Sequence, residues 1–205
     1  MCGRYELNET PARLGSRYHV EPGDIEFAAS ADIAPTTVNP VILVRDGVRR
    51  LSLRRWGLVP SWVSDPKAVR HPFNAASETA AEKPFFRSAL RKWRCVVPVN
   101  AFFEWTPVAG EKRKRKIRIA RADGQIMSLA GLYEYWRKGD EMIASYTILT
   151  TQPNAMMEPI HDRMPVIIAD DEVDAWLDAD TSLVDVRALC MPCPSEWLEA
   201  DPAPS

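Results

Sequence analysis

The run of sequence on which the fold depends reads Ile126-Met-Ser-Leu-Ala-Gly-Leu-Tyr-Glu-Tyr-Trp136. It is rich in the branched and aromatic residues that favour β-structure. Two further β-forming runs flank it at 117–121 and 142–150, and the turns between them hold Asp123-Gly124 and Lys138-Gly139-Asp140. Because turns of this kind join neighbouring strands, we predict three successive antiparallel strands here.

The same pattern continues toward both ends of the chain. Val41–Val44 and Val48–Leu53 flank Asp46-Gly47, a strong hairpin signal, and two more strands are predicted at 95–97 and 101–105. Helices are predicted from Thr10-Pro11 onward, at 83–93, at 170–177 with an N-terminal cap, and at 183–189. The prediction is one α+β domain over 1–205, with a mainly antiparallel, open barrel-like sheet and peripheral helices. Residues 169–200 supply the C-terminal helices, and 201–205 are expected to fray.

Length and charge narrow the class of protein. A chain of 205 residues with 46% hydrophobic content is long enough for one well-buried domain. No apolar run reaches the length of a membrane span, so we expect a cytoplasmic protein. The net charge of −2 divides unevenly, because 158–205 hold 12 acidic residues against two arginines while 1–157 carry +8. This asymmetry is compatible with a polyanion partner and equally with ordinary solvated surface.

The first residues, Met1-Cys2-Gly3-Arg4-Tyr5, offer unusual chemistry. If Met1 is removed, Cys2 carries a free amine and a free thiol on adjacent carbons, and both have a usable nucleophilic fraction near neutral pH. The amine can condense with an aldehyde, after which the thiol closes a five-membered thiazolidine ring. Alternatively the thiol attacks an acyl group with its own amine as base. An accidental Cys after the start residue is the simpler reading of this segment alone.

Three further side chains are candidates for catalysis. Asn74 stands in Phe73-Asn-Ala-Ala-Ser-Glu-Thr79, where an amide can orient a nucleophile or close an Asx turn before a helix. Glu104 shares a strand face with Phe102; if that face is interior, its pKa rises into the range useful for acid catalysis. His161 lies in Ile160-His-Asp-Arg-Met-Pro165 and is either a proton-transfer group or a structural histidine.

Other segments carry weaker signals. Trp56 and Trp62 flank a turn after two arginines, a mixture that binds single-stranded nucleic acid, although at least one of the two is expected to be buried. The basic loop 111–116 is either solvated or near DNA. Cys190-Met-Pro-Cys193 lacks a second pair or a nearby His, so we predict neither a metal site nor a redox centre there.

Ten short motifs occur in one order between residue 1 and about 168: Met1-Cys-Gly-Arg-Tyr5, Ile33-Ala-Pro-Thr36, Trp56-Gly-Leu-Val-Pro-Ser-Trp62, Phe73-Asn-Ala75, Glu78-Thr79, Phe85-Phe-Arg87, Arg94-Cys-Val-Val-Pro98, Phe103-Glu-Trp105, Leu149-Thr-Thr151 and His161-Asp-Arg-Met-Pro165. Together they resemble the SRAP family (SOS-response-associated peptidases, abasic-site DNA–protein crosslinking proteins). An ordered set is far more specific than any single motif.

The resemblance implies a single α+β domain with a positively charged cleft, in which the mature Cys2 forms a thiazolidine with an abasic site in single-stranded DNA and so shields the lesion. It implies that Asn74 positions the amine, that Glu104 donates and accepts protons, and that His161 assists sugar ring opening or holds a phosphate. Self-removal of Met1 is implied as well. The implied partner is DNA, giving a nucleoid-associated monomer without cofactor or metal. Candidate DNA contacts are Arg4, Pro35, Trp56, Trp62, Arg70, Arg87, Thr150 and Arg163.

Two positions depart from the family pattern. Ala76 stands where an Arg is usual, so one phosphate contact is missing or is redistributed to Arg70, and Ala101 stands where Gly is frequent. Two other functions stay open from the sequence. One is an amidohydrolase using Cys2 as an N-terminal nucleophile, and the other is a non-catalytic single-strand binding module that keeps Met1.

Overall fold

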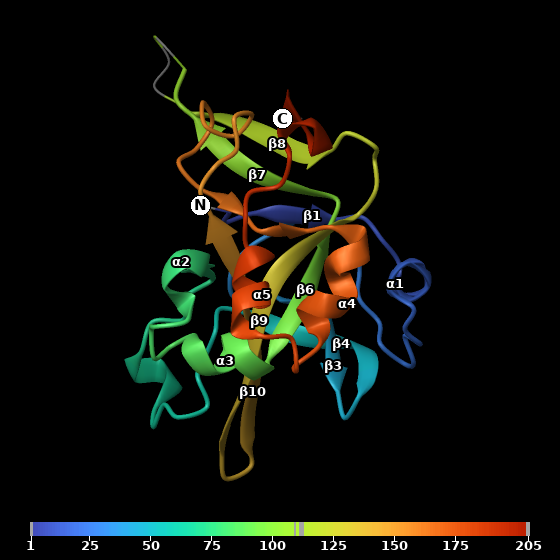
Figure 1. Ribbon diagram of the computed structural model, residues 1–205, viewed down its shortest axis with the longest axis vertical. Helices are drawn as coiled ribbons and strands as arrows, with labels where there is room; N and C mark the ends of the chain where they lie inside the picture. The colour runs from blue at the N-terminus through green and yellow to red at the C-terminus, as the bar shows by residue number, and fades with distance from the viewer. Residues whose placement is uncertain (1, 109, 111–112, 204–205) are drawn as a thin grey trace.

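The computed structural model describes residues 2–108, 110 and 113–203, and it contains two sheets (Figure 1). Residues 1, 109 and 204–205 lie outside this description, as do residues 111–112 of the predicted basic loop. One sheet has the strand order β13 (Leu198–Pro202), β8 (Arg115–Arg121), β7 (Ala101–Thr106), β1 (Tyr5–Leu7), β2 (Ser30–Ile33). The other has the order β11 (Met164–Pro165), β10 (Glu141–Thr151), β4 (Val48–Trp56), β3 (Val38–Arg45), β6 (Arg94–Val99), β9 (Met127–Lys138), β12 (Ile167–Ile168).

Pairing between β9 and β10 closes the second sheet into a barrel. The two strands are antiparallel from Lys138↔Glu141 to Gly131↔Ile148, and they form the long hairpin at one end of the molecule (Figure 1). A parallel contact between β4 and β10 completes the ring of β10, β4, β3, β6 and β9. The short strand β5 (Asn74–Ala76) adds to β10 in parallel. The predicted α+β class with a mainly antiparallel sheet is confirmed, and the barrel is closed rather than open.

The prediction of three successive paired strands is wrong in one respect. β9 and β10 do pair, but β8 pairs with β7 and β13 in the other sheet. Eight consecutive residues of β9 are buried, so this strand needs neighbours and cover on all sides, and β6 and β10 supply its flanks. The turn at Asp123-Gly124 therefore carries the chain from one sheet to the other instead of closing a hairpin. Gly124 has a positive φ of 69° there.

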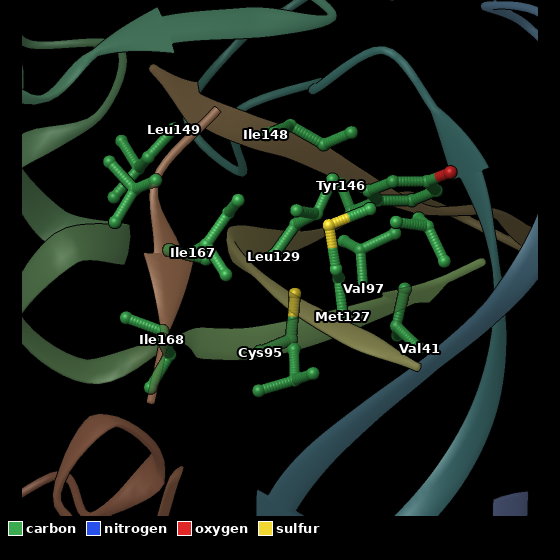
Figure 2. Packing of buried hydrophobic residues seen from close by; sticks show 14 of the residues in the cluster. Val41, Cys95, Val97, Met127, Leu129, Tyr146, Ile148, Leu149, Ile167 and Ile168 are labelled. Atoms are coloured by element: carbon green, nitrogen blue, oxygen red, sulfur yellow. The ribbon is translucent and has the colours of Figure 1, made fainter. Parts of the chain in front are cut away.

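The barrel interior is filled by side chains that include residues of β3, β6, β9 and β10 (Figure 2). Cys95, Leu129 and Ile148 are almost completely buried in this core. Gly131 lets β9 approach β6 closely, because a Cβ at that position would lie 2.8 Å from the sulfur of Cys95. Any side chain at residue 131 would therefore force the barrel wall apart.

Helices cover the outside of the barrel, with α3, α4 and α5 on one side and α1 apart from them (Figure 1). Their bounds are Pro11–Tyr18 for α1, Ser77–Ala80 for α2, Arg87–Lys92 for α3, Val173–Leu177 for α4 and Leu183–Ala188 for α5. Thr10 caps α1 by accepting the N–H of Arg13, and Ser182 caps α5, so both predicted helices are confirmed. The helix predicted at 83–93 is shorter than expected.

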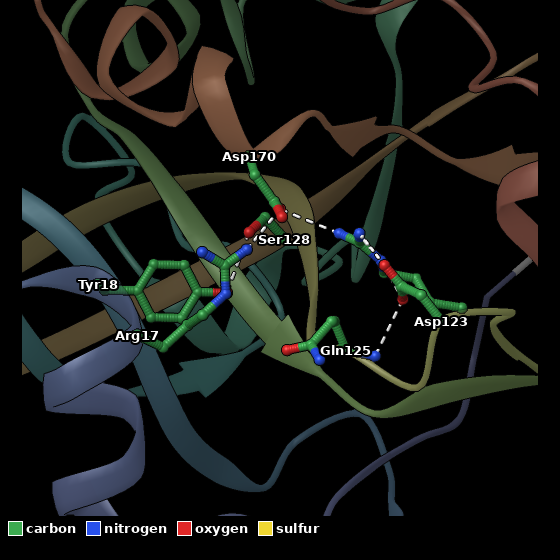
Figure 3. Close-up of polar contacts among 7 residues, drawn as sticks. Arg17, Tyr18, Asp123, Gln125, Ser128 and Asp170 are labelled. Atoms are coloured by element: carbon green, nitrogen blue, oxygen red, sulfur yellow. Dashed lines mark hydrogen bonds and ion pairs between the residues drawn. The ribbon is translucent and has the colours of Figure 1, made fainter.

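The helix predicted at 170–177 is not capped as expected. It begins with a 3-10 turn at Asp170–Glu172, and no side chain at its N-cap accepts a backbone hydrogen bond. Asp170 instead pairs with Arg17 and, at 3.0 Å, with Arg121 (Figure 3). Part of the acidic C-terminal charge is thus neutralised by the basic body of the chain itself.

The C-terminal residues are more ordered than predicted. Residues up to Pro202 form β13, which pairs with β8 from Leu198↔Arg121 to Pro202↔Ile117. The N–H of Ala203 also donates to the carbonyl of Lys116 at 2.9 Å. The expected fraying is therefore wrong for 201–203, because these residues satisfy the backbone groups of a sheet edge. Among the described residues, no helix has the length and apolar character needed to span a bilayer.

Candidate active site

Cys2 lies completely buried immediately before β1. Strand β1 is held between β7 and β2, with Tyr5 opposite Phe102 and Ile33, and this pairing places the start of the described chain inside the fold. Burial raises the pKa of the Cys2 thiol well above its usual range, and the negative charge of Glu104 adds to the effect. In the chain that still carries Met1, burial therefore favours the protonated thiol. The expected thiolate fraction refers to Cys2 after Met1 has been removed, and it stays a prediction.

Asn74 holds the backbone of Cys2. Its Nδ2 donates a hydrogen bond of 2.8 Å to the carbonyl oxygen of Cys2, and β5 pairing with β10 fixes its position opposite Ile148. The Oδ1 of Asn74 is buried and accepts no hydrogen bond from the described residues. Such an atom is costly to leave unsatisfied, so it is suited to accept an N–H beside Cys2. The Asx turn considered for this segment is absent, since residues 74–76 are strand.

Glu104 faces the interior of the fold from β7, together with Phe102. Burial raises the pKa of its carboxyl, while the neighbouring His161 opposes the rise. The predicted interior orientation and raised pKa are both confirmed. A carboxyl with a raised pKa keeps its proton to a higher pH than an exposed carboxyl does, which favours a role in acid–base catalysis.

His161 approaches Glu104 from the turn that precedes β11. Its Nε2 lies 3.8 Å from Oε2 of Glu104. Its Nδ1 accepts the backbone N–H of Arg163 at 3.0 Å, an arrangement that places the proton of the neutral ring on Nε2, toward Glu104. The exposed Asp162 carboxylate lies 2.8 Å from Nδ1 and would accept a hydrogen bond from it if Nδ1 carried a proton. The side chains of His161 and Glu104 are thus arranged for proton exchange with each other.

Arg163 is engaged within the protein. It forms a two-pronged pair with Glu78, at 2.7 and 2.8 Å, and donates to the carbonyl of Thr150 at 2.7 Å. The hydrogen bonds from Arg163 lower the pKa of Glu78. Thr150 is itself buried and braces Arg163, and its direct contact with DNA stays a prediction. The pair fixes the segment on which His161 stands.

The two predicted tryptophans have opposite surroundings. Trp56 is completely buried, lies 5.1 Å from the ring of Tyr5, and donates from its indole N–H to the carbonyl of Phe73. It is part of the core, and its assignment as a stacking residue for DNA is wrong. Trp62 is 59% exposed and meets the ring of Phe85 edge-on at 5.6 Å, so it stays available for a base.

The remaining predicted contacts are spread over the surface. Arg70 and Arg87 are exposed, and Arg70 lines a shallow hollow of about 310 Å³ with Phe85. Pro35 is half-buried, and Arg4 is paired with Asp32 at 2.9 Å. The structure therefore brings Arg70 and Trp62 to the same half-buried ring, Phe85, while Arg4 forms an ion pair.

One residue that supports this site could not be identified from the sequence. Asn154 accepts the N–H of Met157 at 3.0 Å and donates to the carbonyl of Cys193 at 2.9 Å. It ties the turn leading to His161 to the C-terminal segment, and nothing in the local sequence indicates this.

The Cys190 and Cys193 side chains are buried. Burial raises the pKa of Cys190 to about 12 and that of Cys193 to about 11, so neither thiol is readily ionised. Within the described part of the chain, no three His, Cys, Asp or Glu side chains gather as metal ligands would.

The family model for SOS response associated peptidases (SRAP) matches residues 1–205. The chain belongs to the SRAP family. Abasic site processing protein YoqW of Bacillus subtilis is 35% identical over 98% of this chain and 91% of its own length. Abasic site processing protein HMCES of Xenopus tropicalis is 32% identical over 87% of this chain and 66% of its own. The crystal structure of a Bacteroides thetaiotaomicron protein superposes with a TM-score of 0.89 at 27% identity, covering 97% of this chain and 90% of that one.

Proposed function

We propose that this SRAP protein recognises abasic sites in single-stranded DNA and couples to them covalently through Cys2. The observation that carries the proposal is the convergence of Asn74, Glu104 and His161 on a buried Cys2. The names of its relatives as abasic site processing proteins support the same substrate. A protein with this partner would work as a monomer at the nucleoid, in the cytoplasm.

The proposed reaction begins once Met1 has been removed, which frees the amine of Cys2. The amine adds to the aldehyde of the ring-opened sugar and loses water to form an imine. The thiol then adds to the imine carbon and its proton moves to the nitrogen, which closes the thiazolidine. Each step runs in reverse without an oxidant or reductant, so the crosslink can be released by hydrolysis.

The residues divide this work by their chemistry. Asn74 holds the Cys2 backbone and has a buried oxygen suited to accept from its amine. Glu104 takes the proton of the thiol, which burial keeps on the sulfur at rest, and gives a proton to the departing hydroxyl. His161, with Nε2 toward Glu104, exchanges protons with it during sugar ring opening. A buried site favours ring closure because water is excluded from the imine.

Removal of Met1 is the proposed peptidase activity. The Cys2 thiol belongs to the residue whose amide would be cut, and the charge of Glu104 acts on that thiol. Hydrolysis of the bond consumes one water and releases methionine and the Cys2 amine. The exposed ring of Trp62, with Arg70 and Arg87, supplies stacking and charge for a single strand without reading its sequence.

A denaturing gel tests the proposal directly. The purified protein is mixed with a single-stranded oligonucleotide that holds one abasic site, and its intact mass is measured in parallel. A band of slower mobility that survives denaturation, together with a mass lacking methionine, is the expected result. Glutamine hydrolysis without a band would indicate the amidohydrolase, and a retained Met1 with reversible binding only would indicate a non-catalytic module.

A further inference from the structure

A second hollow adjoins the proposed reaction site and takes no part in the chemistry described above. It has a volume of about 350 Å³ and lies between the start of α2 and the segment that follows α5. The side chains that matter in its wall are Ser77, Glu78, Gln152, Arg187, Met191 and Pro192. This volume falls at the lower end of small-ligand sites, ~300–1,000 Å³, and suits a single nucleotide rather than a duplex.

The hollow is joined to the reaction site by one ion pair. Glu78 lines it and holds Arg163, whose backbone N–H is bound by Nδ1 of His161. Ser77, next to Glu78 in the wall, directly follows β5, the strand that positions Asn74 against Cys2. A strand of DNA with its abasic sugar at Cys2 would therefore have a neighbouring nucleotide within reach of this hollow.

The charges in the hollow favour an anion. The negative charge of Glu78 is already neutralised by its ion pair with Arg163. Arg187 is exposed in the last turn of α5 and forms no ion pair with any residue the structure describes, while Asp185 on the same helix is bound to its Ser182 cap. An exposed guanidinium of this kind matches the geometry of a phosphate.

The rest of the wall suits a base. Met191 is 66% exposed and lines the hollow next to Pro192, so the two side chains offer apolar surface there. Gln152 is exposed and presents both a donor and an acceptor. We propose that this hollow is a subsite for the nucleotide next to the lesion, with Arg187 on its phosphate and Met191 against its base. The inference rests on the proposed function only in taking the strand to be abasic DNA.

Two separate measurements test the subsite. The first is fluorescence anisotropy with an intact, non-abasic oligothymidylate over a range of salt concentrations, which needs no crosslinking. Arg187→Ala is expected to weaken binding about three- to tenfold and to reduce the slope of log K against log salt by about 0.7, the loss of one phosphate contact. Met191→Ala is expected to weaken binding without changing the slope. Arg137→Ala, an exposed arginine on the β9–β10 hairpin, serves as the matched control and should change neither.

The second measurement places the abasic site at different distances from either end of the strand. Arg187→Ala should slow crosslinking when nucleotides flank the lesion on the side that reaches the hollow. When that flank is removed, the variant and the parent should crosslink at the same rate. Equal effects of Arg187→Ala and Arg137→Ala, or an equal loss with every oligonucleotide, would overturn the subsite. Salt-dependent binding through Arg187 without any crosslink would uphold the subsite and reject the proposed chemistry.

Discussion

Nε2 of His161 and Oε2 of Glu104 lie 3.8 Å apart, although one residue stands in the turn before β11 and the other in the middle of β7. The bond from Arg163 to Nδ1 leaves the proton of the neutral ring on the side that faces the carboxylate. The negative charge of Glu104 also raises the pKa of the Cys2 thiol, and this effect is second in size to that of burial. This carboxyl therefore connects the nucleophile with the imidazole, and the first two predictions concern it.

Glu104→Gln should slow both formation and reversal of the crosslink, by about 100-fold or more, because an amide neither releases nor takes up the proton. Binding of intact single-stranded DNA should stay within about twofold of the parent. Gel time courses measure the two rates, and anisotropy measures the affinity. Equal crosslinking rates in parent and variant would remove Glu104 from the mechanism.

The same substitution should change how stability depends on pH. Because burial raises the pKa of Glu104, the folded protein binds this proton more tightly than the unfolded chain does. Stability therefore falls as pH rises from the ordinary carboxyl value, about 4.3, through the raised folded value. Glu104→Gln removes this loss. Urea titrations should find the variant more stable than the parent at about pH 8 and the advantage reduced at about pH 4; a constant difference would contradict the argument.

Cys2→Ala should abolish the crosslink while the protein stays folded. Because the side chain is fully buried, the variant should lose about 1–3 kcal/mol of stability. Cys95→Ala is the matched control, since that thiol is equally buried but lies in the barrel wall against Gly131. It should show a similar loss of stability and normal crosslinking. A band from the Cys2 variant would refute the assignment.

The two tryptophans should respond in opposite ways. Trp62→Ala should leave the melting temperature unchanged and weaken binding of single-stranded DNA by about 1–3 kcal/mol, the value of one base stacked on an aromatic ring. Trp56→Ala should cost about 3–5 kcal/mol of stability, because its indole fills the core beside Tyr5. Thermal melts and anisotropy separate the two outcomes. A stable Trp56 variant with weak DNA binding would reverse the assignment made from burial.

Asn154 should act on catalysis through His161. Asn154→Ala removes both the bond to Met157 and the bond to Cys193, so the turn that carries His161 loses its anchor. We expect crosslinking to slow several-fold and its pH profile to shift, with intact-strand affinity unchanged. Asn154→Asp keeps an acceptor for the N–H of Met157 but loses the donor to the carbonyl of Cys193. Its crosslinking rate should therefore lie between those of the parent and Asn154→Ala. Asn8→Ala, an exposed position, is the control; a uniform loss of stability without a change in the pH profile would indicate a structural role only.

Much of the site was accessible from local pattern. Alternation along a strand placed Glu104 on the same face as Phe102, and the structure confirms that this face is interior. The ordered motifs indicated the family as well as the three candidate residues around Cys2, which are Asn74, Glu104 and His161. The same motifs could not separate Trp56 from Trp62, since both flank the same turn and differ in what packs over them.

The order of residues along the chain determined which segments extend, where the β3–β4 hairpin turns, and which chemical groups a processed N-terminus would present. Those features depend on side chains a few positions apart, which interact before any distant contact forms. Only the tertiary structure decided that β8 leaves β9 for the other sheet, that 198–202 add an edge strand, and that Arg163 is bound to Glu78. Such choices depend on which distant surfaces bury each other best, and a strand or an arginine by itself accepts several partners equally well.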